Sequence, residues 1–335
     1  MTAPDPPIAA QHEAGPPSAE EITAAAGLVA RLARNVESIV LGKPLVVRLT
    51  MTALLAEGHV LLEDVPGVGK TTLARAMAAS VQGQWRRIQF TPDLLPSDVT
   101  GVTIFNQATR GFEFHPGPVF ANIVIADEIN RASPKTQSAL LEVMEERNVT
   151  VDGVRHAVPR PFMVVATQNP IEMDGTYRLP EAQLDRFLMK LAVGYPSEAV
   201  EIEVLRGSVT RSPEALDPVT DTQVVAQLVR LARRVHIAEP LFAYAVRLGN
   251  ATRGHHQTRV GVSPRGVIAL TRAASAYALA DGRGYVVPED FKVLAEPVFA
   301  HRLLLSPEAQ VRGIAPGDIV RQVLEAVPVP SPVTA

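Results

Sequence analysis

The chain has 335 residues, of which 47% are apolar and 20% are charged, and none is a cysteine. This composition is typical of a globular protein with a large core, and it excludes disulfides, thiolate metal sites and cysteine nucleophiles. The net charge of −3 does not indicate a dedicated nucleic-acid binder. The first residues lack the regions of a secretion signal, and no apolar run reaches the roughly 18 residues that span a bilayer. We therefore expect a cytoplasmic protein without membrane insertion.

The two ends of the chain are rich in proline and poor in apolar residues, which predicts disordered tails over residues 1–18 and 326–335. From residue 24 to residue 57, apolar side chains recur at helical spacing in two runs, with Gly42 and Pro44 between them. We therefore expect two helices before the first strand.

Short apolar runs then alternate with helical patterns. Five of the runs predict buried strands, at residues 59–63, 86–90, 122–126, 162–167 and 188–193. Helical patterns lie between several of them, notably over residues 70–80 and 134–147, and Ser133 is a natural N-cap for the second. This alternation predicts an α/β fold with a parallel five-stranded sheet flanked by helices.

Two segments interrupt the alternation. Residues 101–120 and 148–162 each alternate apolar and polar side chains around a turn, which predicts two β-hairpins. After Ser197 the strand patterns stop, and four amphipathic helical patterns follow. We therefore predict two domains, an α/β core with two hairpin inserts over residues 19–208 and an all-helical domain over residues 209–325.

The stretch EDVPGVGKTT, residues 63–72, nearly matches the phosphate-binding pattern G-x-x-x-x-G-K-[ST], and it lies between a predicted strand and a predicted helix. Two glycines let several backbone N–H groups point at one anion, and the helix N-terminus adds its positive dipole end. The lysine supplies a charge for the outer phosphates, and the first threonine offers a hydroxyl to Mg²⁺. We assign nucleotide binding to the following residues: Val65, Pro66, Gly67, Val68, Gly69, Lys70, Thr71 and Thr72.

Asp64 stands where the pattern has its first glycine. The chain leaves the strand at this point, so the side chain need not face the phosphates, and we expect Asp64 to be a bystander. The alternative for the whole stretch is a glycine turn with an unrelated lysine. The coincidence of strand, motif and helix disfavours it.

Polar side chains follow two of the predicted strands. Asp127 and Glu128 end the run at 122–126 and therefore lie at the carboxyl edge of the sheet, where ligands bind. Asp127 would hold Mg²⁺ through water, and Glu128 would orient and deprotonate the water that attacks ATP. Asn169 would lie beside Glu128 if the two strands are neighbours, and could hold the water or the γ-phosphate. The alternatives are a solvated acidic turn and an Asn-Pro turn.

Four long stretches of the chain carry a family resemblance: EDVPGVGKTTLARAMA, IADEINRASPKTQSALLEVMEE, FMVVATQNPIEMDGTYRLPEAQLDRF and GVSPRGVIALTRAASAYALADGRGYVVPEDF. Together they closely resemble the MoxR family of AAA+ ATPases, over about residues 20–325. The resemblance implies a P-loop AAA+ core followed by a helical lid domain. The two hairpins then correspond to the helix-2 insert and the pre-sensor-1 insert of this branch.

The resemblance also implies a role for each motif residue in binding ATP and Mg²⁺. Lys70 and Thr71 belong to Walker A, Asp127 and Glu128 belong to Walker B, and Asn169 is sensor 1. Thr71 and Asp127 are the implied metal-binding residues.

Three arginines complete the implied site. Arg186, in LDRF, matches the arginine finger, which reaches the ATP of the neighbouring subunit. Arg265, in SPRG, matches sensor 2, and Arg131 is a candidate for a further interface arginine. A surface salt bridge is the alternative for Arg186, and a plain helix N-terminal residue is the alternative for Arg265. The resemblance also makes Asp64 ordinary, because phosphate loops of this family often begin without the first glycine.

The implied function is remodelling of a client protein by a hexameric ring, with hydrolysis moving the lid through Arg265. The implied partners are a von Willebrand A domain protein and a client held by the hairpins. A metal-chelatase motor subunit and a nucleic-acid motor are alternatives within the same branch, and a monomeric small-molecule kinase is a third. A nucleic-acid motor would need basic hairpin tips, but these carry only Arg110, Arg155 and His156.

Overall fold

The computed structural model describes residues 15–65, 67–169, 177, 179–206 and 212–330. Most of the predicted tails, and Pro66 of the phosphate loop, lie outside these residues. The first helix, α1 (Ala19–Glu37), begins after Ser18, whose side chain forms a capping box with Glu21. Helix α2 (Pro44–Leu55) follows, so the two helices expected before the first strand are confirmed.

One parallel five-stranded sheet forms the centre of the core, in the order β2-β5-β8-β1-β9. Its strands are β1 (Val60–Glu63), β2 (Trp85–Gln89), β5 (Ile123–Asp127), β8 (Met163–Gln168) and β9 (Met189–Leu191). All five predicted strands are confirmed. The four crossovers between parallel strands place helices on both faces of the sheet.

The central strands are buried on both faces because their side chains alternate between two apolar layers. Val60 and Leu62 of β1 pack with α1, α2 and α3 (Lys70–Ser80), whereas Leu61 packs with α5 (Pro134–Glu146). The helix predicted over 134–147 is therefore present, and Ser133 caps it through the Thr136 N–H. The sheet therefore forms a middle layer between two layers of helices, and the polar residues of these strands lie at the strand ends.

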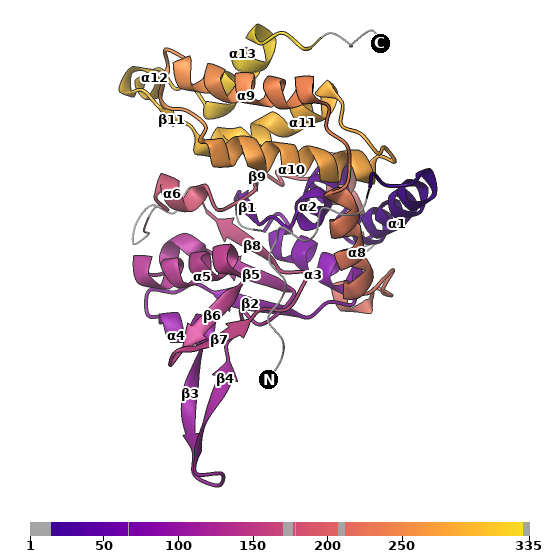
Figure 1. Ribbon diagram of the computed structural model, residues 1–335. Helices are drawn as coiled ribbons and strands as arrows, with labels where there is room; N and C mark the ends of the chain where they lie inside the picture. Colours follow the sequence, from indigo (N-terminus) through magenta and orange to yellow (C-terminus); the bar gives the residue numbers. More distant parts are fainter. Residues whose placement is uncertain (1–14, 66, 170–176, 178, 207–211, 331–335) are drawn as a thin grey trace.

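Both predicted hairpins are present. The first follows α4 (Pro96–Thr100) and consists of β3 (Gly101–Asn106) and β4 (Gly111–Pro116). It projects away from the sheet, at the end opposite the C-terminal helices (Figure 1). The second consists of β6 (Asn148–Val151) and β7 (Val154–Ala157), and its turn residues both adopt positive φ.

The C-terminal part of the chain is helical, as expected. Its helices are α8 (Thr222–Ala232), α9 (Glu239–Gly254), α10 (Pro264–Ala280), α11 (Pro288–Phe299), α12 (Pro307–Val311) and α13 (Pro316–Ala326). Short helices connect it to the sheet or lie within loops: α6 (Glu181–Leu184), α7 (Glu198–Leu205), η2 (Ile129–Arg131), η3 (Pro213–Ala215) and η4 (Ala300–Arg302).

A small antiparallel pair, β10 (Thr258–Val260) and β11 (Leu304–Leu305), adds strand to the domain predicted to be all helical. Strands of two and three residues are too short to show an alternating pattern, so sequence periodicity cannot reveal them.

The helical domain, or lid, is tightly joined to the core. Its helices lie beside the β9 edge of the sheet (Figure 1), and Leu241 and Leu270 belong to the same apolar cluster as Val60. Arg48 of α2 pairs with Asp281 of the lid at 2.8 Å. None of the helices within the described residues is long and apolar enough to cross a membrane.

Candidate nucleotide site

The carboxyl ends of three neighbouring strands bring the predicted motifs together. β8 lies between β1 and β5, with Leu62 paired to Thr167 and Ala126 paired to Ala166. The phosphate loop after β1, the acidic pair after β5 and the buried Asn169 after β8 therefore meet at one edge of the sheet. The strands that precede Glu128 and Asn169 are neighbours, which is the condition under which Asn169 was expected to lie beside Glu128.

The phosphate loop has the backbone that an anion site requires. Gly67 and Gly69 have φ values of +84° and +92°, and a Cβ added to either would meet nothing within 4 Å. The loop thus borders open space just before the N-terminus of α3, whose cap residue offers no side-chain acceptor to the first N–H groups. Free N–H groups at a helix start favour a bound phosphate.

Lys70 lies at the start of α3 and donates from Nζ to the Asp64 carbonyl at 2.6 Å. Burial lowers the pKa of Lys70, and the nearby carboxylates of Asp64, Asp127 and Glu128 oppose that shift. The charged lysine therefore lies between the loop and the acidic pair, where the outer phosphates of a nucleotide would fit.

Asp64 has a structural role that sequence reasoning missed. One of its carboxylate oxygens accepts the Val65 N–H at 2.8 Å, and the other accepts the Gly194 N–H. Gly194 follows β9, so this carboxylate ties the start of the phosphate loop to a second strand end. The expectation that this side chain need not face the phosphates agrees with these contacts, but the carboxylate has a structural partner that the sequence did not reveal.

We predict that Asp64→Ala lowers the free energy of unfolding by roughly 1–3 kcal/mol, because two partly buried N–H groups lose their acceptor. We also expect weaker nucleotide binding, because the loop loses its tie to β9. Denaturant unfolding and nucleotide titration measure the two effects.

The matched control for this prediction is Asp221→Ala. Asp221 also accepts two backbone N–H groups, at 2.8 and 2.9 Å, but it caps α8 in the lid. It should cost comparable stability without altering nucleotide affinity. Equal nucleotide affinity in Asp64→Ala and wild type would contradict the anchoring role.

Asp127 is buried and surrounded by donors. Its carboxylate accepts from the hydroxyl of Thr167 at 3.0 Å and of Thr71 at 3.4 Å, and it pairs with Arg87 Nε at 2.6 Å. No group of three or more acidic or histidine side chains that could hold a metal occurs in the described part of the chain. The hydroxyl of Thr71 and the carboxylate of Asp127 suit Mg²⁺, which takes few protein ligands and fills the rest with water and phosphate oxygens.

Glu128 is held in an unusual backbone conformation, with φ of +54°. Its N–H donates to Thr167 Oγ1 at 3.0 Å. Its Oε2 accepts from Gln89 Nε2 and from Arg131 Nη1, each at 2.9 Å. A left-handed conformation at a non-glycine residue costs energy and occurs mainly where the surroundings impose it, often at functional sites.

Arg186 and Arg265 do not lie at this edge. Arg186 precedes β9, and β9 runs parallel to β1, so Arg186 lies at the opposite edge of the sheet from the phosphate loop. Its Nε contacts Glu145 at 3.0 Å, and Arg265, on the first turn of α10, contacts the same carboxylate at 2.5 Å. Burial alone would raise the pKa of Glu145, but the two arginines more than offset this and lower it.

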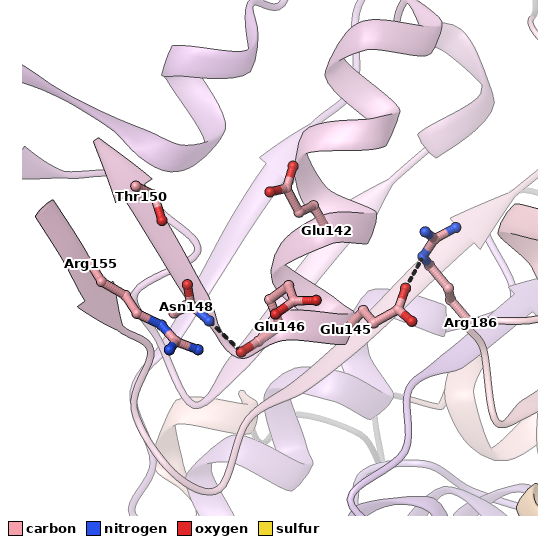
Figure 2. A pocket seen from close by; sticks show the side chains of 7 residues that line it. All are labelled: Glu142, Glu145, Glu146, Asn148, Thr150, Arg155 and Arg186. Atoms are coloured by element: carbon pink, nitrogen blue, oxygen red, sulfur yellow. Dashed lines mark hydrogen bonds and ion pairs between the residues drawn. The ribbon is translucent and has the colours of Figure 1, made fainter. Parts of the chain in front are cut away.

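A cavity of about 440 Å³ lies beside this arginine pair. Figure 2 shows Arg186 directed at Glu145 from one side of it, with β6 and β7 on the other. Three glutamates of α5, two arginines and two neutral polar side chains line it: Glu142, Glu145, Glu146, Asn148, Thr150, Arg155 and Arg186. One chain thus carries two separate polar sites, at opposite ends of the strands of its sheet.

Comparison with known proteins shows to which family the chain belongs. Residues 59–189 match the model of the ATPase family associated with various cellular activities (AAA), and residues 250–323 match the AAA lid domain. Chaperone MoxR1 of Mycobacterium tuberculosis is 42% identical over 328 residues, covering 95% of this chain and 87% of that protein. The chain belongs to the MoxR family of AAA+ ATPases.

Two further proteins are similar over most of the chain. The Bacillus subtilis protein YeaC is 52% identical over 304 residues, covering 90% of this chain and 95% of that protein. A crystal structure of a Cytophaga hutchinsonii protein has 37% identity and a TM-score of 0.87, and covers 93% of this chain and 98% of that one. The predicted AAA+ core and helical lid are therefore confirmed.

Within this MoxR-family site, sequence reasoning missed two residues of β2, Arg87 and Gln89. They contact Asp127 and Glu128 because β2 pairs with β5, with Gln89 opposite Asp127. The only signal was the presence of polar residues in the predicted strand at 86–90. Arg131, proposed as an interface arginine, pairs with Glu128 of its own chain.

Proposed function

We propose that the chain assembles into a ring, hydrolyses ATP with Mg²⁺ between subunits, and uses the cycle to remodel client proteins. One observation supports the shared site most directly: Arg186 and Arg265 lie on the opposite edge of the sheet from Lys70. Within one subunit these arginines are remote from the phosphate loop. The phosphate loop of one subunit and the two arginines of the adjacent subunit would together complete one site.

Each residue of the catalytic edge then has a separate task. Lys70 and the loop N–H groups bind the phosphates. Thr71 and Asp127 would hold Mg²⁺, which would supply positive charge to the phosphates. Gln89 and Arg131 both bind Glu128 at Oε2, so we assign its other oxygen to accept the proton of the attacking water. Asn169 orients that water or the γ-phosphate.

The other end of the strands, which carries Arg186 and Arg265, supplies positive charge to the nucleotide site of the neighbouring subunit. A guanidinium stays protonated and can bind two phosphate oxygens at once. An arginine supplied across an interface accelerates NTP hydrolysis by about 10³–10⁵-fold. We assign this role to Arg186, with Arg265 beside it because both share Glu145. To reach a neighbouring nucleotide, both guanidinium groups must exchange this carboxylate for phosphate oxygens.

The remodelling role rests on the relatives, one of which is named Chaperone MoxR1. We propose a hexameric cytoplasmic ring that works with a von Willebrand A domain protein. The β3–β4 hairpin is the client-contacting element in this proposal. Phe105 and Phe112 face each other near its tip, with ring centroids 5.3 Å apart, and both are exposed.

Mixed assemblies test the shared site. ATP turnover per chain should rise with protein concentration, because a lone subunit lacks an arginine in trans. Lys70→Ala and Arg186→Ala should each be inactive, whereas their equimolar mixture should recover part of the turnover. The recovery occurs where the phosphate loop of an Arg186→Ala subunit meets Arg186 of a Lys70→Ala subunit. Concentration-independent turnover, with no recovery in the mixture, would rule the shared site out.

A further inference from the structure

The segment that carries Arg186 contacts both the core, in which Phe187 is buried, and the lid. It connects α6 to the start of β9, and the Leu188 N–H is bound by the His59 carbonyl of the core. The carbonyls on either side of Arg186 instead accept from one lid side chain, Arg302. Its guanidinium donates to the carbonyl oxygens of Asp185 at 3.2 Å, Phe187 at 2.7 Å and Leu188 at 3.2 Å.

Arg302 also pairs with the Asp185 carboxylate, at 2.6 Å from Nε, and only 3% of its side chain is exposed. The neighbouring His301 contacts the Phe187 carbonyl at 3.1 Å. Burial lowers the pKa of His301 well below its usual value, so this imidazole adds no positive charge beside Arg302. The contacts converge on residues 185–188, the stretch that contains Arg186.

A second lid contact reaches the same stretch. The Ser263 hydroxyl donates to Asp185 Oδ2 at 3.2 Å. Ser263 is also the N-cap of α10, the helix that carries Arg265. The backbone before Arg186 and the start of the Arg265 helix are thus joined through one carboxylate, while Glu145 joins the two guanidinium groups.

We propose that Arg302 is a positioning residue that ties the backbone around Arg186 to the lid, so that the lid helps to set where Arg186 points in the neighbouring site. The inference rests on the shared site proposed above. The planar guanidinium has five N–H donors in a fixed fork. Here it contacts three carbonyls of this segment and the Asp185 carboxylate, as well as the Val298 carbonyl of the lid. No other side chain can make all of these contacts from one buried position.

The test adds Arg302→Gln to one partner of the mixed assembly at a time. In the Lys70→Ala subunit, which donates Arg186, the change should abolish the recovery of ATP turnover. In the Arg186→Ala subunit, which has no finger to position, recovery should persist. The expected loss is of the order of 100-fold at saturating ATP, the scale of a 1 Å misplacement of a catalytic group. The ATP concentration at half-saturation should not change, because the partner's loop holds the nucleotide.

Two further variants guard against a folding defect. Arg302→Lys keeps the charge opposite Asp185 but loses the fork, and it should show the same asymmetry if Arg302→Gln does not fold. Arg283→Gln is the matched lid control: Arg283 pairs with the buried Asp290 at 2.6 Å in a different part of the lid. It should affect both partners equally.

The outcomes separate the two proposals. If Lys70→Ala and Arg186→Ala do not complement each other at all, the shared site itself fails. If they complement each other, but the Arg302 changes reduce recovery equally in either partner or in neither, the positioning role is overturned. A loss confined to the donor subunit supports it.

Discussion

Replacing Arg186 with Ala should lower the maximal ATP turnover by about 10³-fold or more, while nucleotide affinity stays close to that of the wild type. The reason is spatial. Arg186 lies at the other end of the strands from its own phosphate loop. In the proposed ring, its loss would remove charge from the transition state in a neighbouring subunit and leave the loop intact. Arg186→Lys should recover only part of the rate, because an ammonium lacks the planar fork.

Phosphate release at saturating ATP and titration with a fluorescent nucleotide measure the two quantities separately. Arg155→Ala is the control, because Arg155 lines the same cavity as Arg186 but is carried by β7. It should leave turnover near that of the wild type. A full rate in Arg186→Ala would remove the residue from the catalytic site.

The second large effect is expected for Glu128→Gln. An amide cannot accept the proton of the attacking water, and loss of a general base typically lowers the rate by about 10²–10⁴-fold. The glutamine side chain is nearly isosteric with that of glutamate, so ATP should still bind and the assembly should remain loaded. This variant is therefore also the one to use for capturing a client protein.

The matched control is Glu63→Gln. Glu63 ends β1 at the same edge of the sheet, but its carboxylate pairs with Lys190 at 2.7 Å. Its removal should leave turnover within a few-fold of the wild type. If Glu128→Gln lost ATP binding along with turnover, Glu128 would be a nucleotide ligand and not the base.

The predictions that succeeded depend on local patterns. A strand buried on both faces is a short apolar run, and β1, β5 and β8 each end such a run with polar residues. The Asp152-Gly153 turn likewise needs only its own two residues, which can adopt positive φ. Motif, strand and helix then locate the phosphate loop within a few residues.

The features that were missed depend on tertiary packing. Strand order decides that Arg87 and Gln89 reach the acidic pair, and no local pattern shows that β2 lies beside β5. The shared Glu145 depends on how the lid docks, since Arg265 comes from a helix far along the chain. The structural contact of Asp64 was missed because its partner, Gly194, follows a strand that is distant in the sequence.

Strand β9 runs between the two polar sites, which lie at opposite ends of the strands of the sheet. Gly194, bound by Asp64 of the phosphate loop, follows one end of this strand, and Arg186 precedes the other. An extended strand is close to its maximum length, so a shift of one end along its axis displaces the other end by a similar amount. In the proposed ring, a movement of the phosphate loop in one subunit would therefore shift the Arg186 that this subunit places in the nucleotide site of its neighbour. Such coupling favours ATP hydrolysis in a fixed order around the ring over independent hydrolysis in each subunit.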